Sequence, residues 1–249
     1  MDIKNIKHQI RRNFSNAAEQ YSGWARVQEQ SASMLAAMMP GVKAETVLDI
    51  GCGTGFLTGK VMAKLKPEKL TGLDFAEGMT RLCAQQWPGS KFLCVDAEEY
   101  DPGEQFSVVV SNFTFQWLGD LPKAMKAFYS WVKPGGFFAF CVPVKGSLKE
   151  LSGLSGAFYD FPDETGFLKP LPKPVVRLVE DMTVYYDSPV EAVKSLKKIG
   201  ANYKEGAGSG KKLTRAGLKE YGRLYKDSTG KYPVTYRVLT VVVKKRKAK

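Results

Sequence analysis

The stretch that most constrains this chain lies between Glu45 and Phe56, where a short apolar run meets a turn with three glycines. Residues 46–50 are rich in β-branched side chains and predict a buried strand. The turn, Gly-Cys-Gly-Thr-Gly at residues 51–55, precedes an amphipathic helical pattern over residues 56–65. A strand, a glycine turn and a helix start together predict a nucleotide-type site. Glycine lets the backbone approach a ligand closely, and the helix start offers unpaired N–H groups.

The spacing of the glycines narrows the class of ligand. It is G-x-G-x-G, whereas a dinucleotide site reads G-x-G-x-x-G and a P-loop requires Gly-Lys-Ser/Thr. An acid, Asp49, stands inside the motif just before the first glycine and would repel a pyrophosphate. The same acid suits a ligand that carries an ammonium or sulfonium cation.

Two further acids follow predicted strands. Residues 69–73 are followed by Asp74, in the place of the ribose-binding acid of doubly wound folds, and residues 91–95 are followed by Asp96. The glycine turn and these acids therefore recur at successive strand ends. Such ends share one edge of a parallel sheet, which predicts an α/β fold with its ligand at that edge.

These segments resemble a known family. Val-Leu-Asp-Ile-Gly-Cys-Gly-Thr-Gly at residues 47–55, Gly-Leu-Asp-Phe-Ala-Glu-Gly-Met at 72–79 and Val-Asp-Ala-Glu at 95–98 are similar to the S-adenosylmethionine (SAM) site of class I methyltransferases. The resemblance covers about residues 43–142. It implies a Rossmann-like, doubly wound and mostly parallel seven-stranded sheet, with SAM as the cofactor.

The resemblance also implies roles for individual residues. Asp49 takes the ammonium group of SAM, Asp74 accepts hydrogen bonds from both ribose hydroxyls, and Asp96 holds the adenine amino group. The glycines let the backbone run close to the methionine moiety, and Phe75 and Met79 flank the adenine base. The expected cofactor-binding set is Asp49, Gly51, Gly53, Gly55, Asp74, Phe75, Met79, Asp96, Ala97 and Asn112.

The rest of the chain predicts a single domain over residues 1–249. Residues 3–39 have a helical period with a break at Gly23, so residues 1–40 form a helical lid in which Tyr21 is a candidate lid residue. Residues 43–142 form the SAM-binding core, residues 143–175 a helical insertion after strand five that covers the substrate, and residues 176–249 complete the sheet. The remaining predicted helices are 76–86, 121–132, 148–159, 189–199 and 214–225; the strands are 105–110, 137–142, 175–186 and 233–243; 133–136 is a turn and 161–174 is irregular.

Composition excludes several classes of protein. No apolar run approaches the ~20 residues of a membrane span, and the charged N-terminus does not resemble a secretory signal. The four cysteines are scattered and His8 is the single histidine, so no metal site is expected and the thiols are those of a cytoplasmic protein.

The chemistry that the sequence predicts needs no general base. Asn112 stands where the family faces the transferring methyl, within Ser-Asn-Phe-Thr at residues 111–114. The missing Pro-Pro counts against methylation of DNA adenine or glutamine amides. No histidine, lysine or cysteine is placed as a base. A carboxylate is already nucleophilic, so the enzyme needs to align it and exclude water.

A closer resemblance runs nearly end to end. It rests on Phe14 to Tyr21, residues 111–117, 146–151, 195–201 and 232–236, which together are similar to the malonyl-[acyl-carrier-protein] O-methyltransferase family of biotin synthesis. Lys198 departs from the glycine expected in Ser-Leu-Lys-Gly-Ile-Gly. The resemblance implies methyl esterification of the free carboxylate of a malonyl thioester. The expected substrate-side residues are Tyr21, Gln116 and Trp117, and Arg177 and Lys145 are candidates to anchor the carboxylate.

The predicted partner is an acyl carrier protein that carries a malonyl group, or malonyl-CoA in its place. Acyl carrier proteins are strongly acidic, and residues 201–249 hold 14 Lys and Arg against 3 Asp and Glu, which is +11 of the net charge of +12. A basic face that includes Lys211, Lys212 and Arg215 is expected to dock the carrier. No membrane or nucleic-acid partner is expected. The alternatives are a methyltransferase for another small carboxylic acid or for RNA, and a SAM-binding interaction protein without transfer activity.

Overall fold

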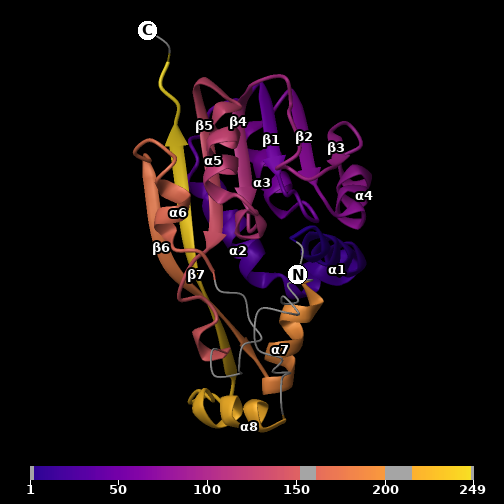
Figure 1. The fold of residues 1–249 in the computed structure, drawn as a ribbon, viewed down its shortest axis with the longest axis vertical. Coiled ribbons are helices and arrows are strands. Elements are labelled where there is room, and N and C mark those ends of the chain that lie inside the picture. Colours follow the sequence, from indigo (N-terminus) through magenta and orange to yellow (C-terminus); the bar gives the residue numbers. More distant parts are fainter. Residues whose placement is uncertain (1–2, 152–160, 200–214, 248–249) are drawn as a thin grey trace.

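The computed structural model describes residues 3–151, 161–199 and 215–247, and these form a seven-stranded sheet with helices on both faces (Figure 1). The strand order is β3-β2-β1-β4-β5-β7-β6. The strands are β1 (Thr46–Ile50), β2 (Lys69–Asp74), β3 (Lys91–Cys94), β4 (Phe106–Asn112), β5 (Val132–Pro143), β6 (Val176–Tyr186) and β7 (Tyr232–Lys244). The helices are α1 (Ile3–Trp24), α2 (Arg26–Met38), α3 (Phe56–Leu65), α4 (Glu77–Gln86), α5 (Leu121–Ser130), α6 (Glu164–Leu168), α7 (Pro189–Lys198) and α8 (Arg215–Leu224).

The sheet has the doubly wound topology that the sequence predicts. Strands β1, β2 and β3 build outward in one direction, and the chain then returns to place β4 on the other side of β1. The pairs up to β5 are parallel, and β7 is antiparallel to both its neighbours. In such sheets a ligand binds beyond the carboxyl ends of the strands, at the point where the strand order reverses. Here that point lies between β1 and β4.

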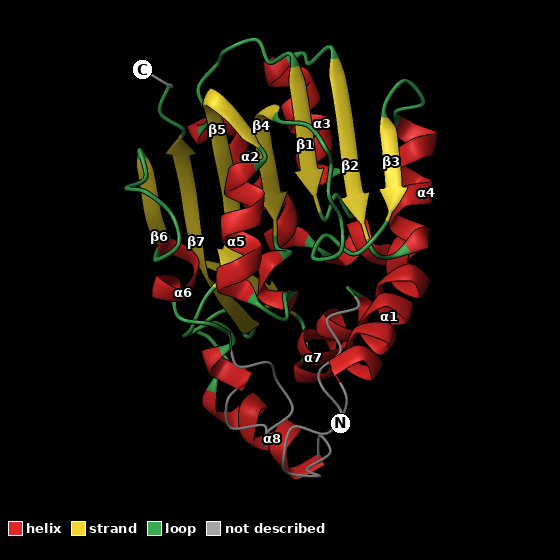
Figure 2. Ribbon diagram, turned by 45° about the horizontal axis from the view of Figure 1, so that its top comes forward, coloured by secondary structure: helices red, strands yellow, loops and turns green. Residues whose placement is uncertain are grey.

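Both faces of the sheet are buried. Strand β1 is fully buried, and its successive residues Val47 and Leu48 enter two different clusters of apolar side chains. One cluster packs under α2 and α3 and includes Leu35 and Leu57; the other packs under α5 and includes Phe128. Figure 2 shows the helices on either side of the strands. A continuous run of apolar residues is therefore the correct pattern for a central parallel strand.

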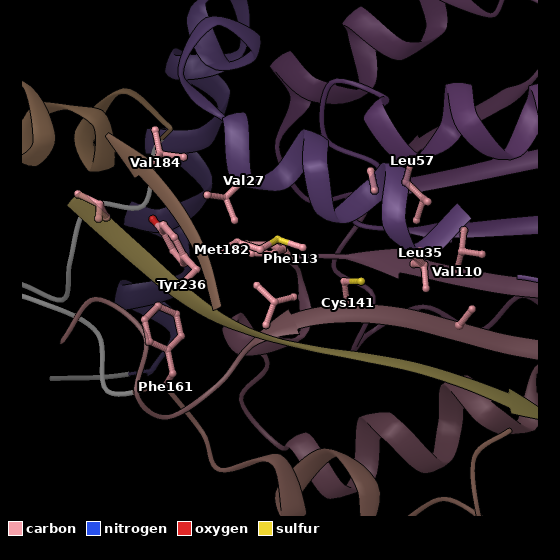
Figure 3. Packing of buried hydrophobic residues seen from close by; sticks show 14 of the residues in the cluster. Val27, Leu35, Leu57, Val110, Phe113, Cys141, Phe161, Met182, Val184 and Tyr236 are labelled. Carbon is pink, nitrogen blue, oxygen red and sulfur yellow. The ribbon is translucent and has the colours of Figure 1, made fainter. Parts of the chain in front are cut away.

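Strands β6 and β7 extend past the rest of the sheet. The last pair between β5 and β7 is Pro143 with Val238, but the β6–β7 pairing continues from there to Tyr186 with Tyr232. Because β7 is antiparallel, its first residues lie at the carboxyl edge of the parallel strands. Figure 3 shows Tyr236 of this overhang beside Phe113, in the cluster that α2 also enters.

Most predicted elements are confirmed within one or two residues, and five expectations need correction. The expected turn at 133–136 lies inside β5, where the pairing register with β4 shifts between Phe106 and Val108. Gly136 permits this because a Cβ there would lie 2.5 Å from the Ser107 carbonyl oxygen. The helix expected to reach Val132 ends at Ser130 and the strand begins two residues later.

The other corrections concern the lid and the insertion. The N-terminal helices are separated at Ala25, whose backbone φ and ψ are −86° and 47°, and not at Gly23. The stretch expected to be irregular contains α6, which Asp163 begins by accepting a hydrogen bond from the Thr165 N–H. Of the helix expected at 148–159, the described residues form only a short 3-10 turn at Lys149–Leu151, and 152–160 lie outside the described residues.

Candidate functional site

A cavity with about 880 Å³ of empty space lies at the carboxyl edge of β1, β2, β3 and β4. The loops after these four strands form its floor, and α1 contributes Lys7, Phe14 and Tyr21 to the opposite wall. The position is the one that the strand order predicts for a ligand.

The glycine turn forms part of the cavity floor, but its three glycines have different structural roles. Gly51 and Gly53 line the cavity, and Gly55 does not. All three have positive backbone φ angles (71°, 55° and 91°), which residues other than glycine rarely adopt. A Cβ on Gly53 would meet nothing within 4 Å, so the backbone there borders open space. A Cβ on Gly55 would lie 2.2 Å from the Trp87 ring, which makes that glycine a packing requirement.

Asp49 lies behind the glycine turn and does not line the cavity. It is 1% exposed, and its Oδ2 accepts a hydrogen bond from Thr58 Oγ1 at 2.6 Å. Its Oδ1 is buried without a hydrogen-bond partner among the described residues. Burial raises the pKa of Asp49 from 3.8 to about 7, against the opposing effect of Thr58. An orphaned carboxylate oxygen next to the turn fits a cationic ligand that reaches it directly or through water.

Asp74 occupies the end of β2 and lines the cavity. Its Oδ2 accepts the Gly53 N–H at 3.0 Å and its Oδ1 accepts the Ala76 N–H at 2.8 Å. These bonds fix the carboxylate between the glycine turn and α4. Burial raises the pKa of Asp74 to about 6 despite both N–H groups. The carboxylate is therefore held in place with further acceptor capacity for a ligand.

The far end of the cavity contains the residues expected around the base. Phe75, Met79, Asp96 and Ala97 all line it. The structure adds a residue that sequence reasoning missed. Lys7 Nζ of α1 lies 2.6 Å from Asp96 Oδ2 and 2.5 Å from Glu98 Oε2. The expected adenine-binding acid is thus paired with a lysine of the N-terminal helix.

Asn112 lines the cavity, but both polar atoms of its side chain form hydrogen bonds to α2. Ser31 Oγ donates to its Oδ1 at 2.7 Å, and its Nδ2 donates to the Gln28 carbonyl at 2.9 Å. Both partners lie on α2. In the structure, Asn112 therefore fastens α2 to the end of β4, beside the cavity in which the sequence expects it to face the methyl.

A second cavity of about 490 Å³ adjoins the first. It is lined by all three residues expected on the substrate side, Tyr21, Gln116 and Trp117. Five residues line both cavities and form a shared wall between them: Phe14, Tyr21, Gln28, Phe113 and Trp117. Phe115 instead packs into the aromatic core, with its ring 5.3 Å from those of Phe128 and Phe140. A ligand in either cavity would therefore contact this shared wall.

Neither of the two cations suggested as carboxylate anchors lines either cavity. Arg177 NH2 lies 2.6 Å from Glu164 Oε2 and is half exposed. Lys145 is exposed on the loop after β5. The expected basic face falls partly outside the described residues, because Lys211 and Lys212 lie there, whereas Arg215 begins α8.

Three cavity residues that the sequence analysis did not assign to the site, Lys7, Phe14 and Gln28, share a recognisable spacing with the predicted Tyr21. Lys7, Phe14 and Tyr21 recur every seven residues, which places them on one face of α1, and all three line the first cavity. Gln28 continues the series on α2 and lines both cavities. This seven-residue recurrence of long polar and aromatic side chains was the available signal for a ligand-facing helix surface.

The described residues contain no group of three or more His, Cys, Asp or Glu side chains arranged to hold a metal. No helix within the described ranges is long and apolar enough to cross a membrane.

Comparisons with known proteins agree with this geometry. Residues 47–136 match a family described as a methyltransferase domain. The malonyl-[acyl-carrier protein] O-methyltransferase of Salmonella typhimurium is 30% identical over 96% of this chain and 98% of its own length. The protein of that name from Serratia marcescens is 28% identical over 92% of each chain.

Solved structures share the fold at low sequence identity. The YcgJ protein of Bacillus subtilis has a TM-score of 0.62 and 13% identity, covering 88% of this chain and 99% of that one. Geranyl diphosphate C-methyltransferase from Streptomyces coelicolor, solved with S-adenosyl-L-homocysteine, has a TM-score of 0.56 and 13% identity, covering 89% and 80%. Fold, cofactor cavity and relatives converge: this chain uses SAM and belongs to the class I SAM-dependent methyltransferases, in the family of the malonyl-[acyl-carrier protein] O-methyltransferases.

Proposed function

We propose that this enzyme methylates the free carboxylate of malonyl-[acyl-carrier protein], or of malonyl-CoA, to give a malonyl methyl ester that primes the pimeloyl part of biotin. One observation carries the proposal. The similarity to the Salmonella relative extends through α1, α2, α7 and β7, which contribute residues to the second cavity, and is not confined to the cofactor-binding residues.

The residues of the first cavity fit SAM. Open space beside Gly53 admits the methionine moiety, and the orphaned oxygen of Asp49 offers a partner for its ammonium group. Asp74 is placed to accept the ribose hydroxyls, and Phe75 and Met79 line the base end. When bound, SAM supplies a methyl group on a sulfonium, which a carboxylate oxygen takes as the methyl–sulfur bond breaks and its electron pair returns to sulfur.

The protein's part in this transfer is to position the acceptor and exclude water. Phe14, Phe113 and Trp117 form an aromatic part of the shared wall, and Phe113 is 8% exposed. The Phe14 and Trp117 rings pack edge to face at 5.7 Å, which closes the wall from α1. An ionised carboxylate has no proton to lose, so the reaction needs no general base. Alignment in a dry site supplies the rate enhancement.

A basic surface near the second cavity supports the choice of a carrier protein. Helix α7 lines that cavity through Leu196 and Ile199 next to its end, and α8 lies against α7 (Figure 1). The exposed positions of α8 and the loop after it include Arg215, Lys219 and Lys226. Positive charge at this end of the molecule steers an acidic carrier toward the cavity entrance and raises the association rate.

The test is a methyl-transfer assay with labelled SAM that offers malonyl-[acyl-carrier protein], malonyl-CoA, free malonate and bulk RNA. The expected result is a base-labile methyl ester on the malonyl carrier. Label on malonate alone would identify a small-acid methyltransferase, and label on RNA alone an RNA methyltransferase. SAM binding without any transfer would favour an interaction protein. Each of these three results would overturn the proposal.

A further inference from the structure

Gln28 places a polar side chain at the boundary between the two cavities. It is 6% exposed and lines both cavities. Its backbone carbonyl accepts the hydrogen bonds from Ser31 and Asn112, which fix this turn of α2. Its side-chain amide makes no hydrogen bond to any residue in the described part of the chain. Because this amide lines both cavities, a ligand in either of them is its natural hydrogen-bond partner.

Tyr236 presents a second group of this kind. It is 7% exposed, lies on the overhang of β7 and lines the second cavity. Its ring packs against Phe113 of the shared wall with centroids 5.8 Å apart (Figure 3). Its hydroxyl has no hydrogen-bond partner within residues 3–151, 161–199 and 215–247. Burial raises the pKa of Tyr236 far above 10, so the phenol remains a protonated donor at any physiological pH.

Tyr21 adds a third donor from a third element. It lines both cavities, and its hydroxyl is likewise without a hydrogen bond to a described residue. Burial first, and the nearby Asp74 second, raise the pKa of this phenol well above 10. Among the described residues that line the second cavity, none carries a charge. The polar groups that the described residues offer to an acceptor there are therefore neutral.

We infer that Gln28, Tyr21 and Tyr236 hold the acceptor carboxylate at the shared wall through neutral hydrogen bonds, in place of a cationic anchor. The inference rests on the proposed function, since it concerns the carboxylate that is methylated. Gln28 and Tyr236 become substrate-positioning residues in addition to Tyr21.

The chemistry of esterification favours neutral donors. One carboxylate oxygen bonds to the methyl carbon while the other stays a hydrogen-bond acceptor. The negative charge disappears and no proton is released. A lysine or arginine at this place would attract electron density from the attacking oxygen, and it would be left as an unpaired buried charge beside the ester. An amide and two phenols bind the acid, then donate more weakly to the neutral ester carbonyl, which assists product release.

Two conservative variants test the inference. Tyr236→Phe and Gln28→Met remove the donors with little change of shape. Their matched controls are Tyr185→Phe, on the exposed side of β6, and Gln30→Met, on the exposed face of α2. The measurements are calorimetric affinities for malonyl-CoA and for its methyl ester, each with S-adenosylhomocysteine present, and the affinity for SAM.

We expect each variant to weaken malonyl-CoA binding about tenfold or more, as for a hydrogen bond to a charged group, and ester binding about threefold or less. SAM affinity and both controls should stay at the wild-type level. Equal losses of affinity for the acid and for the ester would overturn the inference. The residues would then contribute to the shape of the cavity without distinguishing the charged acid from the neutral ester. A loss of SAM affinity alone would overturn it as well, by placing these side chains on the cofactor.

The transfer assay with wild-type enzyme separates this inference from the proposed function. Suppose that the wild-type enzyme esterifies malonyl-CoA or malonyl-[acyl-carrier protein], while the variants lose affinity for acid and ester equally. The proposed function is then supported and the inferred neutral anchor is wrong. If no malonyl ester forms, the proposed function fails, and the anchor fails with it for this acceptor.

Discussion

Lys7 and Asp96 are joined by an ion pair of 2.6 Å that links the N-terminal helix to the end of β3. Burial alone would lower the pKa of Lys7, but the hydrogen bonds to Asp96 and Glu98 outweigh it and raise the pKa above 10.5. Glu98 also accepts N–H groups of Gly119 and Asp120. Lys7, about a quarter exposed, is thus one of the residues that attach helix α1 over the cofactor cavity, together with Ser15 and Ser22.

Replacing this lysine should loosen α1. Lys7→Met leaves two adjacent carboxylates without their cation, so we expect the free energy of unfolding to fall by about 1–2 kcal/mol in urea titrations at pH 7. Because the folded pKa is raised, the stabilisation is present at neutral pH and is lost as pH rises above about 10.5. The control is Lys43→Met, whose pair with Glu68 is exposed and should cost less than about 1 kcal/mol. Equal losses would contradict a special role for Lys7.

Asp74→Ala should weaken SAM binding by about tenfold or more, because it removes an acceptor for the ribose and the support of the Gly53 N–H. Isothermal titration calorimetry gives the affinity directly. Asp101→Ala is a matched control, since that carboxylate accepts the Gly103 N–H in an exposed turn. An unchanged SAM affinity would remove Asp74 from the site.

Asp49→Asn should have opposite effects on stability and on binding. Because burial raises the pKa of Asp49 from 3.8 to about 7, the folded state favours its protonated form. Its contribution to stability is therefore present at low pH and lost as pH rises through about 7. The neutral amide should stabilise the cofactor-free protein by about 1–3 kcal/mol at pH 8 and have little effect near pH 4.

The same variant lacks the anion for the SAM ammonium, so its SAM affinity at pH 8 should fall about tenfold. Chemical denaturation at the two pH values and calorimetry give both results. A variant that is less stable at pH 8, or that binds SAM normally, would show that the buried charge is not held for the ligand.

Ser31→Ala should detach α2 from β4. It leaves Asn112 Oδ1 without its donor, which predicts a loss of about 1–3 kcal/mol and faster hydrogen exchange along α2. Ser33→Ala removes a similar hydroxyl that bonds the Glu29 carbonyl on the exposed face, and should change stability by less than about 0.5 kcal/mol. If both serines prove equivalent, the Ser31–Asn112 contact does not fasten the helix.

Charge reversal on α8 should discriminate between carriers. We expect the triple change Arg215→Glu, Lys219→Glu and Lys226→Glu to lower kcat/KM for malonyl-[acyl-carrier protein] about tenfold and to change that for malonyl-CoA little. Reversal of three exposed lysines elsewhere, Lys60, Lys91 and Lys126, should leave both values near wild type. Equal losses on both substrates would argue against docking at α8.

The cofactor half of the site could be predicted from sequence because its residues follow local rules. Strand period and glycine spacing put Asp74 and Asp96 at one sheet edge, and the structure places both in one cavity. Asp49 and Gly55 are the exceptions. They stand in the same motif, but one lies behind the turn and the other packs on Trp87, and neither fact is visible in the spacing.

The substrate half depends on long-range geometry. Tyr236 reaches the second cavity because β7 is antiparallel and overhangs β5, which no local pattern specifies. Phe113 and Phe115 are two residues apart, yet the 3-10 turn at Phe115–Trp117 sends one to the shared wall and the other into the core. The insertion after β5 was predicted as the substrate cover, and its described part contributes Leu148 and Phe161 to the cavity.

The shared wall has a thermodynamic consequence. Phe14 and Tyr21 of α1 contact both ligand spaces, so whichever ligand binds first bears the entropy of fixing that helix. The second ligand then binds to an ordered surface. Linkage requires the two effects to be equal: the factor by which SAM tightens the acceptor is the factor by which the acceptor tightens SAM. A wall that belongs to two cavities thereby predicts that each substrate tightens the binding of the other.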